Sequence, residues 1–469
     1  MNKIKKIILA ISFLTVVLVI SGCGCKPANT HKYDLDLEIW GPLDQETAMR
    51  EIFDNYSLIN PNVSKITYKK IPIDTYRKEL MDALASGQGP DIFMVNNLWL
   101  PSFTDKIAPA PSEVDPRIIN EQKFRNNFID VVAEDFIKEN KIYAVPLSVD
   151  SLALFYNKDL LNQAGIATPP KNWNEFIDDV IKLKSVDSFG NIIHSGAAIG
   201  TAYNINRSTD ILNLIMLQNG TEMTDDMGRV AFDDSFSKTD SNPNGVYLGE
   251  EALNFYTQFA NSKSFNYTWN PNMHYSIDAF SEGLTAMMIN YSWNVDTILA
   301  KSPKLNFAVS PVPQFENKAP VNFANYWGFV VAKNSISKTL QSTVTISNDT
   351  RVKEAWWFLT YLSTKPDGTF AGTSSGSGVG QSANLKLDPA VKFLAKTGQP
   401  AARRDLIELQ KTDPKVGVFA AGNLIAKSWR QKDSTSVESI FAEMIDSVNK
   451  GQATVSDALK TAAQRVNNL

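Results

Sequence analysis

The stretch IYAVPLSVDSLALFYNKDLLNQAGIATPPKNWNEF, from Ile142 to Phe176, decides the fold of this chain. Its first half predicts two strand-like runs, from Ala144 to Val149 and from Leu152 to Tyr156, with the carboxylate of Asp150 between them. Asn157 then stands where a helix N-cap is expected, ahead of a short helical pattern. Strands that lead directly into helices are typical of the α/β class.

The end of this stretch predicts a second helix. Pro169 and Pro170 favour an extended approach, and Asn172 with Glu175 three residues later has the spacing of a capping box. Trp173 and the apolar residues after it then follow a helical period. We therefore expect Trp173 to pack inside the protein.

Strand and helix also alternate toward the N-terminus. The pattern predicts a strand from Leu35 to Trp40, a helix over about 45–57, a strand over 64–70, a helix capped by Asp74, and a buried strand from Ile92 to Val95. This order predicts a doubly wound α/β lobe. At 469 residues the chain is too long for one core, so we expect two lobes.

The N-terminus predicts export. Three lysines precede an apolar run from Ile7 to Ile20, which is short for a membrane span and typical of a signal peptide over residues 1–22. The run ends in VISGC, so Cys23 is the expected lipidation site, with Cys25 a poorer fit. Residues 23–34 would then form the lipidated start and a polar tether. We expect the mature protein to be anchored to the outer face of the cytoplasmic membrane.

Composition excludes several classes of site. Both cysteines of the chain lie in this N-terminal segment, and only three histidines are present, so neither a disulfide, a thiolate metal site nor a histidine-based catalytic centre is expected in the folded body. No cofactor is indicated. Without residues 1–22 the net charge goes from 46 − 50 = −4 to 43 − 50 = −7. An acidic protein is a poor partner for nucleic acid.

Several short motifs together resemble one family. VP, FYNKDLL, AGI, PP and NWNEF occur in an order similar to that of bacterial extracellular solute-binding proteins of family 1, and above all of its sugar-binding, maltose-binding-like members. The resemblance implies two doubly wound lobes joined by a multi-crossover hinge, as in type II periplasmic binding proteins. The chain would cross near 149–151 and again near 310–313, giving a first lobe of 35–148 plus 312–364 and a second of 149–311 plus 365–469.

The resemblance also implies a function. The protein would be a monomeric, non-enzymatic lipoprotein that captures a sugar or oligosaccharide between its lobes and delivers it to the permease of an ABC importer. Three alternatives stay open: an exported glycoside hydrolase, a carrier of another solute such as a polyamine, an iron complex or glycerol phosphate, and a sensory lipoprotein.

Candidate ligand contacts follow from the same resemblance, because aromatic rings stack on sugar rings while carboxylates and amides bind hydroxyl groups. Trp293, in AMMINYSWNV, and Asp150 are the foremost candidates. The full predicted set is Trp40, Asp44, Asn97, Trp99, Asp150, Asn290, Trp293, Tyr326, Trp327, Arg403 and Trp429.

Several candidates have a structural alternative, and Trp99 could equally hold a loop in place. Trp40 could pack in a core, Asp44 could cap a helix, and Asp150 could form a salt bridge in the hinge. Arg403, like its neighbour Arg404, could be a solvated surface charge. The sequence does not decide between these roles.

Overall fold

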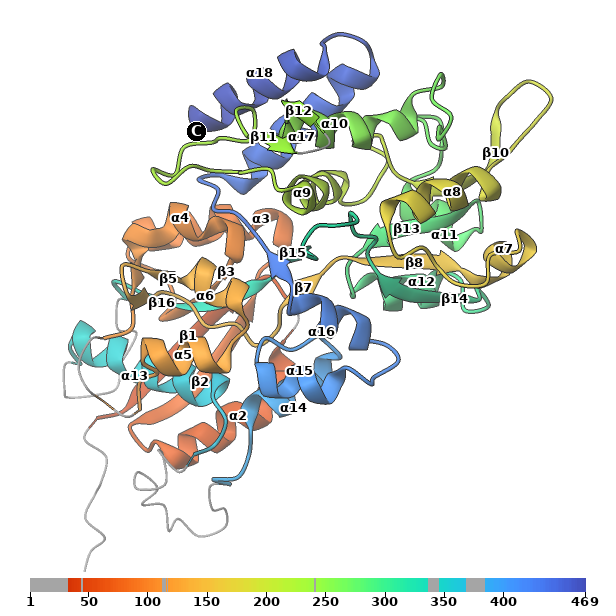
Figure 1. The fold of residues 1–469 in the computed structure, drawn as a ribbon. Helices are drawn as coiled ribbons and strands as arrows, with labels where there is room; N and C mark the ends of the chain where they lie inside the picture. Colours follow the sequence, from red (N-terminus) through yellow and green to blue (C-terminus); the bar gives the residue numbers. More distant parts are fainter. Residues whose placement is uncertain are drawn as a thin grey trace, which may run out of the picture.

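The computed structural model describes residues 33–43, 45–111, 115, 117–239, 242–335, 346–367 and 384–469. Within them the chain forms two lobes, each with a five-stranded sheet and its own hydrophobic core (Figure 1). The predicted two-lobed α/β fold is confirmed. No helix among the described residues combines the length and apolar character needed to cross a bilayer.

The sheet of the first lobe is mixed. β1 (Leu35–Gly41) lies parallel to both β2 (Val63–Lys70) and β3 (Ile92–Asn96), while β16 (Trp327–Ala332) returns antiparallel beside β3 and pairs with β4 (Ile107–Ala108). Its helices and short elements are α2 (Glu46–Ile59), α3 (Ile73–Ala85), η1 (Asn97–Trp99), α4 (Leu100–Phe103), η2 (Thr104–Lys106), α5 (Glu121–Asn127), α6 (Asp130–Phe136), β5 (Ile137–Lys138), β6 (Lys141–Ile142), α13 (Asn348–Ser363), α14 (Pro389–Thr397) and α15 (Arg404–Gln410).

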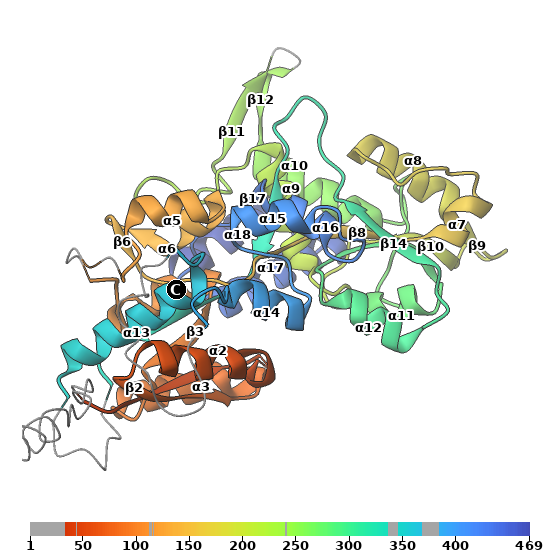
Figure 2. The same cartoon turned by 90° about the horizontal axis from the view of Figure 1, so that it is seen from below.

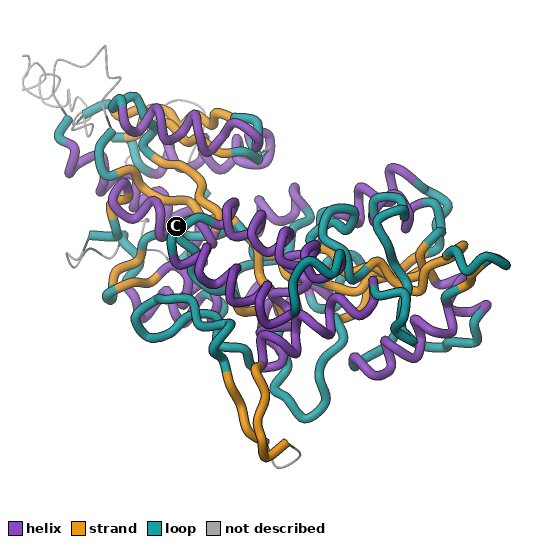
Figure 3. Tube along the Cα trace, turned by 90° about the horizontal axis from the view of Figure 1, so that it is seen from above, coloured by secondary structure: helices purple, strands orange, loops and turns teal. Residues whose placement is uncertain are grey.

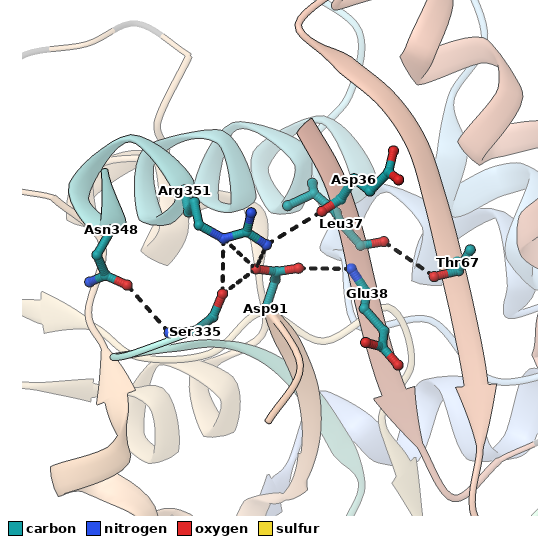
Figure 4. Close-up of polar contacts among 8 residues, drawn as sticks. All are labelled: Asp36, Leu37, Glu38, Thr67, Asp91, Ser335, Asn348 and Arg351. Carbon is teal, nitrogen blue, oxygen red and sulfur yellow. Dashed lines mark hydrogen bonds and ion pairs between the residues drawn. The ribbon is translucent and has the colours of Figure 1, made fainter. Parts of the chain in front are cut away.

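A buried ion pair joins three parts of the first lobe (Figure 4). Arg351 of α13 donates from Nε to Oδ1 of Asp91, 3.0 Å away, and Ser335 after β16 contacts both side chains. The other Asp91 oxygen accepts from the backbone N–H of Glu38 in β1 at 2.9 Å. Because every charge has a partner, this pair fixes α13 against the sheet without leaving a buried charge uncompensated.

The second lobe has the strand order β14 (Phe307–Pro311), β8 (Ala153–Asn157), β13 (Thr285–Asn290), β10 (Ile192–Ala198), β9 (Ser185–Val186). Its hairpin, β11 (Phe236–Thr239) with β12 (Asn242–Tyr247), projects from the body (Figures 2 and 3). The remaining elements are α7 (Lys158–Gln163), α8 (Trp173–Leu183), α9 (Ser208–Asn219), α10 (Leu248–Thr257), η3 (Gln258–Ala260), α11 (Ser276–Ser281), α12 (Asn294–Lys301), α17 (Ser434–Asn449) and α18 (Val455–Asn467).

The helix caps of the decisive stretch form as predicted, but its first predicted strand does not. Residues 144–149 make only isolated bridges, at Val145 and Ser148, and the strand begins at Asp150. The Asn157 side chain accepts from the N–H groups of Asp159 and Leu160, and the Asn172 side chain accepts from Glu175 N–H. Trp173 is buried. The predicted cap by Asp74 is wrong, because α3 begins at Ile73 and its N-cap is Pro72, two residues before Asp74.

Three passes of the chain between the lobes form one small sheet, which we call the hinge sheet. It consists of β17 (Ala426–Lys427), β15 (Asn322–Asn325) and β7 (Asp150–Ser151), and it lies between the lobes in Figure 1. Amide side chains fasten it: Asn322 donates to Leu152 O at 2.8 Å and Asn423, in α16 (Gly417–Asn423), donates to Val149 O at 2.6 Å. The short strands leave the lobes connected yet able to bend.

The packing differs from the predicted lobe division in two places. The second crossing is β15, not residues 310–313, because Val312 and Phe323 belong to the core of the second lobe. Residues 387–407, expected in the second lobe, pack in the first, where Phe393 and Ile407 are buried. The apolar faces of α14 and α15 predict that these helices are packed, but they do not show which core the helices pack against.

Candidate functional site

A cavity of about 560 Å³ lies between the lobes, with residues of both in its walls. It opens next to the hinge sheet, whose Asn325 lines it. This volume falls in the usual range for small-molecule sites, and the space between two α/β lobes is where such sites occur. We call this cavity the cleft. Among the described residues no group of three histidine, cysteine or acidic side chains could hold a metal ion.

The wall of the first lobe is aromatic. Trp99, in the turn directly after β3, and Trp327, at the start of β16, meet edge to face with ring centroids 5.0 Å apart. Their strands are antiparallel neighbours, and Trp327 pairs in register with Asn96, so the end of β3 and the start of β16 meet at one edge of the sheet. Tyr326 lines the cleft beside them.

The wall of the second lobe carries Trp293, in the turn between β13 and α12. Its ring is stacked on Tyr291 with centroids 4.6 Å apart, and the side chain is 43% exposed. The Arg207 guanidinium lies 5.5 Å from the Trp293 ring centroid. Trp293 is thus held by Tyr291 and still offers ring surface to the cleft.

Among the described residues, three charged side chains line the cleft: Arg207, Asp210 and Glu438. Burial lowers the pKa of Arg207, whereas the negative charges nearby, that of Asp210 above all, raise it. The second effect is larger, so the pKa lies above its usual value. Burial raises the pKa of Asp210, which accepts a hydrogen bond from Tyr291 Oη at 2.9 Å. Glu438 is exposed overall, but its carboxylate is partly shielded from water, which raises its pKa. The negative charge of Asp210 raises the pKa further.

Amide side chains make up much of the remaining polar wall. Asn96 donates to Asn325 Oδ1 at 2.8 Å, and Asn213 accepts from the Trp429 ring N–H at 2.9 Å. Gln45, Gln399 and Gln431 also line the cleft. Aromatic rings and amides together suit a neutral ligand with an apolar face and many hydroxyl groups.

The structure brings four of the predicted contacts into the cleft wall: Trp99, Trp293, Tyr326 and Trp327. They come from both lobes. The Tyr326 hydroxyl donates to Asp135 at 2.7 Å, so this residue presents its ring rather than its hydroxyl. Asp44 and Cys23 lie outside the described residues.

Asp150 does not line the cleft, and its role differs from the predicted one. Its Oδ1 accepts from Ser151 N–H at 3.0 Å, and its Oδ2 accepts from the backbone N–H and hydroxyl of Ser292 at 3.0 and 2.6 Å. Burial raises the Asp150 pKa to about 7. Asp150 therefore connects β7 of the hinge sheet to the turn that carries Trp293.

Three further predicted contacts lie one layer behind the wall. Asn97 donates to Asp135 at 3.0 Å, Asn290 donates to Asn206 at 3.0 Å, and Trp429 is buried with its ring stacked on Phe441. None of the three lines the cleft. Their partners show why: each side chain is occupied in holding a neighbouring loop or helix in place.

Trp40 and Arg403 lie away from the cleft. Trp40 is 6% exposed, its ring N–H donates to Glu38 at 2.7 Å, and Lys69 lies over its ring. Arg403 is 3% exposed and forms ion pairs with Asp388 at 2.8 Å and Asp405 at 2.9 Å. Both are structural in this conformation.

Sequence reasoning missed the charged residues of the cleft. Arg207 and Asp210 flank the start of α9, and Glu438 lies early in α17. In the sequence these positions look like ordinary polar residues at helix starts. The left-handed backbone conformation at Arg207 was not predictable from the sequence, because only glycine or asparagine would have signalled it.

Comparison with known proteins places the chain in a family. The family model described as bacterial extracellular solute-binding protein matches residues 41–368. The galactooligosaccharide-binding protein of Bacillus subtilis (strain 168) is 22% identical over 345 residues, which are 68% of this chain and 70% of that protein. A binding protein of Brucella abortus (strain 2308) is 26% identical over 136 residues, 29% of this chain, and the chain spans only 32% of the length of that relative.

Solved structures share the fold. The cyclic α-maltosyl-1,6-maltose binding protein of Arthrobacter globiformis superimposes with a TM-score of 0.68 at 19% identity, covering 93% of this chain and 98% of that one. A sugar-binding protein from Xanthomonas citri gives 0.66 at 20% identity, covering 92% and 97%. With a family model that matches most of its length and this shared two-lobed fold, the chain belongs to the bacterial extracellular solute-binding proteins.

Proposed function

We propose that this protein binds a sugar or oligosaccharide in the cleft and delivers it, chemically unchanged, to the permease of an ABC importer. The observation that carries the proposal is the pairing of aromatic rings across the cleft: Trp99 and Trp327 on one lobe, Trp293 on the other. A sugar ring has an apolar face that stacks on such rings. Only a ligand that touches both lobes favours the closed state.

The relatives support a carbohydrate ligand. Those from Bacillus subtilis are named galactooligosaccharide-binding and arabinooligosaccharide-binding proteins. The amide-lined cleft, with no metal site among the described residues, agrees with a neutral polyhydroxylated ligand better than with a polyamine or an iron complex.

Thermal unfolding with added sugars tests the proposal. Galactobiose, arabinobiose, mannobiose and maltotriose are each added at up to 10 mM. A sugar present at about 100 times its dissociation constant adds about 2.7 kcal/mol to the folded state, which raises the melting temperature by several degrees. Isothermal titration then gives the affinity. If none of the four shifts the melting temperature while spermidine or glycerol 3-phosphate does, the carbohydrate proposal is wrong.

Release of an unchanged ligand separates the carrier from a glycoside hydrolase. A hydrolase needs two carboxyl groups on either side of the scissile bond. Asp210 and Glu438 both line the cleft on the second lobe, and the Asp210 carboxylate already accepts from Tyr291. Incubation with the bound oligosaccharide followed by chromatography should show no shorter sugar. Any turnover that Glu438→Gln abolishes would make the protein an enzyme.

We also propose that Cys23 carries the lipid that anchors a monomer to the outer face of the membrane. The Cys23→Ala variant should move from the detergent phase to the aqueous phase in a cloud-point partition, whereas Cys25→Ala should not. Light scattering on protein that lacks residues 1–23 should give the mass of one chain. Equal partition of both variants would contradict the anchor.

A further inference from the structure

Arg207 holds a backbone conformation that has to be explained. It precedes α9 with φ 63° and ψ 29°, in the left-handed region, although it is neither glycine nor asparagine. Its side chain does not cap the helix. Such a conformation costs free energy and persists where the surrounding structure or the function requires it. Its effect here is to direct a guanidinium toward the cleft.

The Arg207 guanidinium has unused hydrogen-bonding capacity. Its Nε is buried, with no hydrogen-bond partner among the described residues. The side chain lies near the Trp293 ring, and the charges of Asp210 and Glu438 raise its pKa. In the described part of the chain it forms no ion pair within 4.0 Å with either carboxylate. Buried donors in native proteins are almost always paired with protein, water or ligand, so the Arg207 Nε is free to donate to an acceptor that enters the cleft.

Other polar groups around the cleft are equally free. Glu438 makes no hydrogen bond or ion pair with the residues that the structure describes, and its carboxylate lines the cleft. On the opposite lobe Gln45, which is 3% exposed, has a buried Oε1 that lacks a partner in the same part of the chain. Unpaired donors and acceptors thus face the same cavity from both lobes.

The charges in the cleft restrict the ligand. Among the described residues of its wall, one side chain is positive, Arg207, and two are negative, Asp210 and Glu438, so their sum is 1 − 2 = −1. An acidic sugar would bring its carboxylate next to those of Asp210 and Glu438, and Arg207 is the one cation among the described residues of the wall. A neutral sugar can donate hydroxyl protons to Glu438 and accept from Arg207 with no like-charge contact.

We propose that Arg207 and Glu438 form a subsite beside Trp293 that binds adjacent hydroxyl groups of a neutral sugar unit and discriminates against sugars that carry a carboxylate. Gln45 completes the subsite from the other lobe when the lobes are closed. This inference rests on the proposed carbohydrate function and states which chemical class of sugar the cleft accepts.

Matched sugar pairs test the proposal on the full mature protein. Galactobiose is compared with digalacturonate, and mannobiose with dimannuronate, by isothermal titration at pH 7. The neutral member of at least one pair should bind, and its charged partner should bind at least 10-fold more weakly. If no sugar of any kind binds, the proposed carbohydrate function itself fails. If a charged sugar binds more tightly than its neutral partner, the function stands and the subsite is wrong.

Two variants identify the residues responsible. Glu438→Gln should weaken binding of the neutral sugar by roughly 10- to 100-fold, the size expected for loss of a hydrogen bond to a charged group. It should also reduce the difference in affinity between the neutral and the acidic sugar. Glu443→Gln is the matched control, because Glu443 lies on the same helix and pairs with Arg465 at the surface. Unchanged affinity of Glu438→Gln would overturn the assignment.

Arg207→Gly separates a binding role from a structural one. Glycine adopts the left-handed conformation without strain, so the unliganded variant should melt at the same temperature or higher. Its affinity for the neutral sugar should fall by roughly 10-fold or more, because the guanidinium fork is lost. A variant that melts lower and binds normally would show that Arg207 serves the fold alone.

Discussion

Trp293 and Trp429, two tryptophans of the second lobe, were both predicted to contact the ligand. In the structure only Trp293 of the two lines the cleft. Trp293 is 43% exposed in the cleft, and Trp429 is 6% exposed behind it. We expect Trp293→Ala to weaken sugar binding by about 1 to 3 kcal/mol and to leave the melting temperature of the free protein nearly unchanged. Titration and thermal unfolding measure both quantities.

Trp429→Ala is the matched comparison. This substitution removes a buried ring and its hydrogen bond to Asn213, so the free energy of unfolding should fall by about 3 to 5 kcal/mol. If instead Trp293→Ala were the destabilising variant, the Trp293 ring would belong to the core and not to the ligand.

The buried carboxyl of Asp150 makes stability depend on pH. Its pKa is raised from 3.8 to about 7 by burial, so the folded state binds a proton more tightly than the unfolded chain does. Stability from this group is therefore full below about pH 4 and is lost as the pH rises toward 7. The loss amounts to several kcal/mol in order of magnitude.

Asp150→Asn removes this dependence. Denaturant unfolding between pH 4 and pH 7 should show a less negative slope of unfolding free energy against pH for the variant than for the wild type. Asp135, whose pKa burial raises to about 6, contributes a slope of the same sign in both proteins, so the difference between them reports Asp150. Equal slopes would mean that water reaches the Asp150 carboxylate.

At this scale the sequence predicts residue types better than residue roles. Trp293 was found because it follows a buried strand in a familiar motif. Asp150 was placed in the cleft because an acidic residue after a strand looks the same whether it meets a ligand or the N–H of Ser292. Arg207 was missed because its bend depends on tertiary packing and leaves no periodic signal.

In the second lobe, α8 packs so closely on β10 that only a glycine fits at position 196 of the strand. A Cβ added at Gly196 in β10 would lie 2.5 Å from the carbonyl oxygen and 2.7 Å from the Cα of Val180 in α8. Backbone atoms of a helix cannot move aside singly. Gly196→Ala should therefore lower the free energy of unfolding by about 1 to 3 kcal/mol.

Gly422 in α16 provides the comparison. A Cβ there would meet the side-chain ends of Asn322 and Ser151, at 2.7 and 2.8 Å, in the hinge sheet. Side chains can rotate, so Gly422→Ala should cost less than Gly196→Ala in chemical denaturation. A reversed order would mean that the hinge is more rigid than the α8 packing.

Elements were predicted well where periodicity and caps agree. β1, β2, β3, β8 and α2 occur within a few residues of their expected bounds, and Asn157 and Asn172 cap the helices they were expected to cap. The destination of α14 and α15 was not predictable, because an apolar helix face shows that a helix packs and not which of two cores receives it.

For the molecule as a whole, an ion pair between the lobes should favour closure. Arg77 of α3 and Asp433 at the start of α17 lie on different lobes and are 2.6 Å apart, and the Arg77 guanidinium also lies 5.5 Å from the Trp99 ring centroid. Opening of the lobes has to separate them. Asp433→Asn keeps a helix cap and removes the charge, so it should raise the dissociation constant about 2- to 5-fold at low salt.

Scattering and salt provide the readouts. The radius of gyration of the unliganded Asp433→Asn protein should increase, and its binding defect should disappear at 1 M salt, where surface ion pairs are screened. Glu46→Gln, which breaks the Arg50 pair within α2 alone, is the control. A defect that persists at high salt would assign Asp433 a role other than pairing with Arg77.

The interleaving of the two lobes has a consequence for how the protein is made. The first lobe begins at its N-terminal strand and is completed only by α13, α14 and α15, so no single contiguous stretch of the chain is a lobe. During synthesis the core of the first lobe is incomplete until Ala426 has been added, and that of the second lobe until Val466 has been added. Long-range topologies of this kind fold late and slowly. For a family that works outside the cell, the delay keeps the newly made polypeptide loose enough to be threaded through a translocation pore.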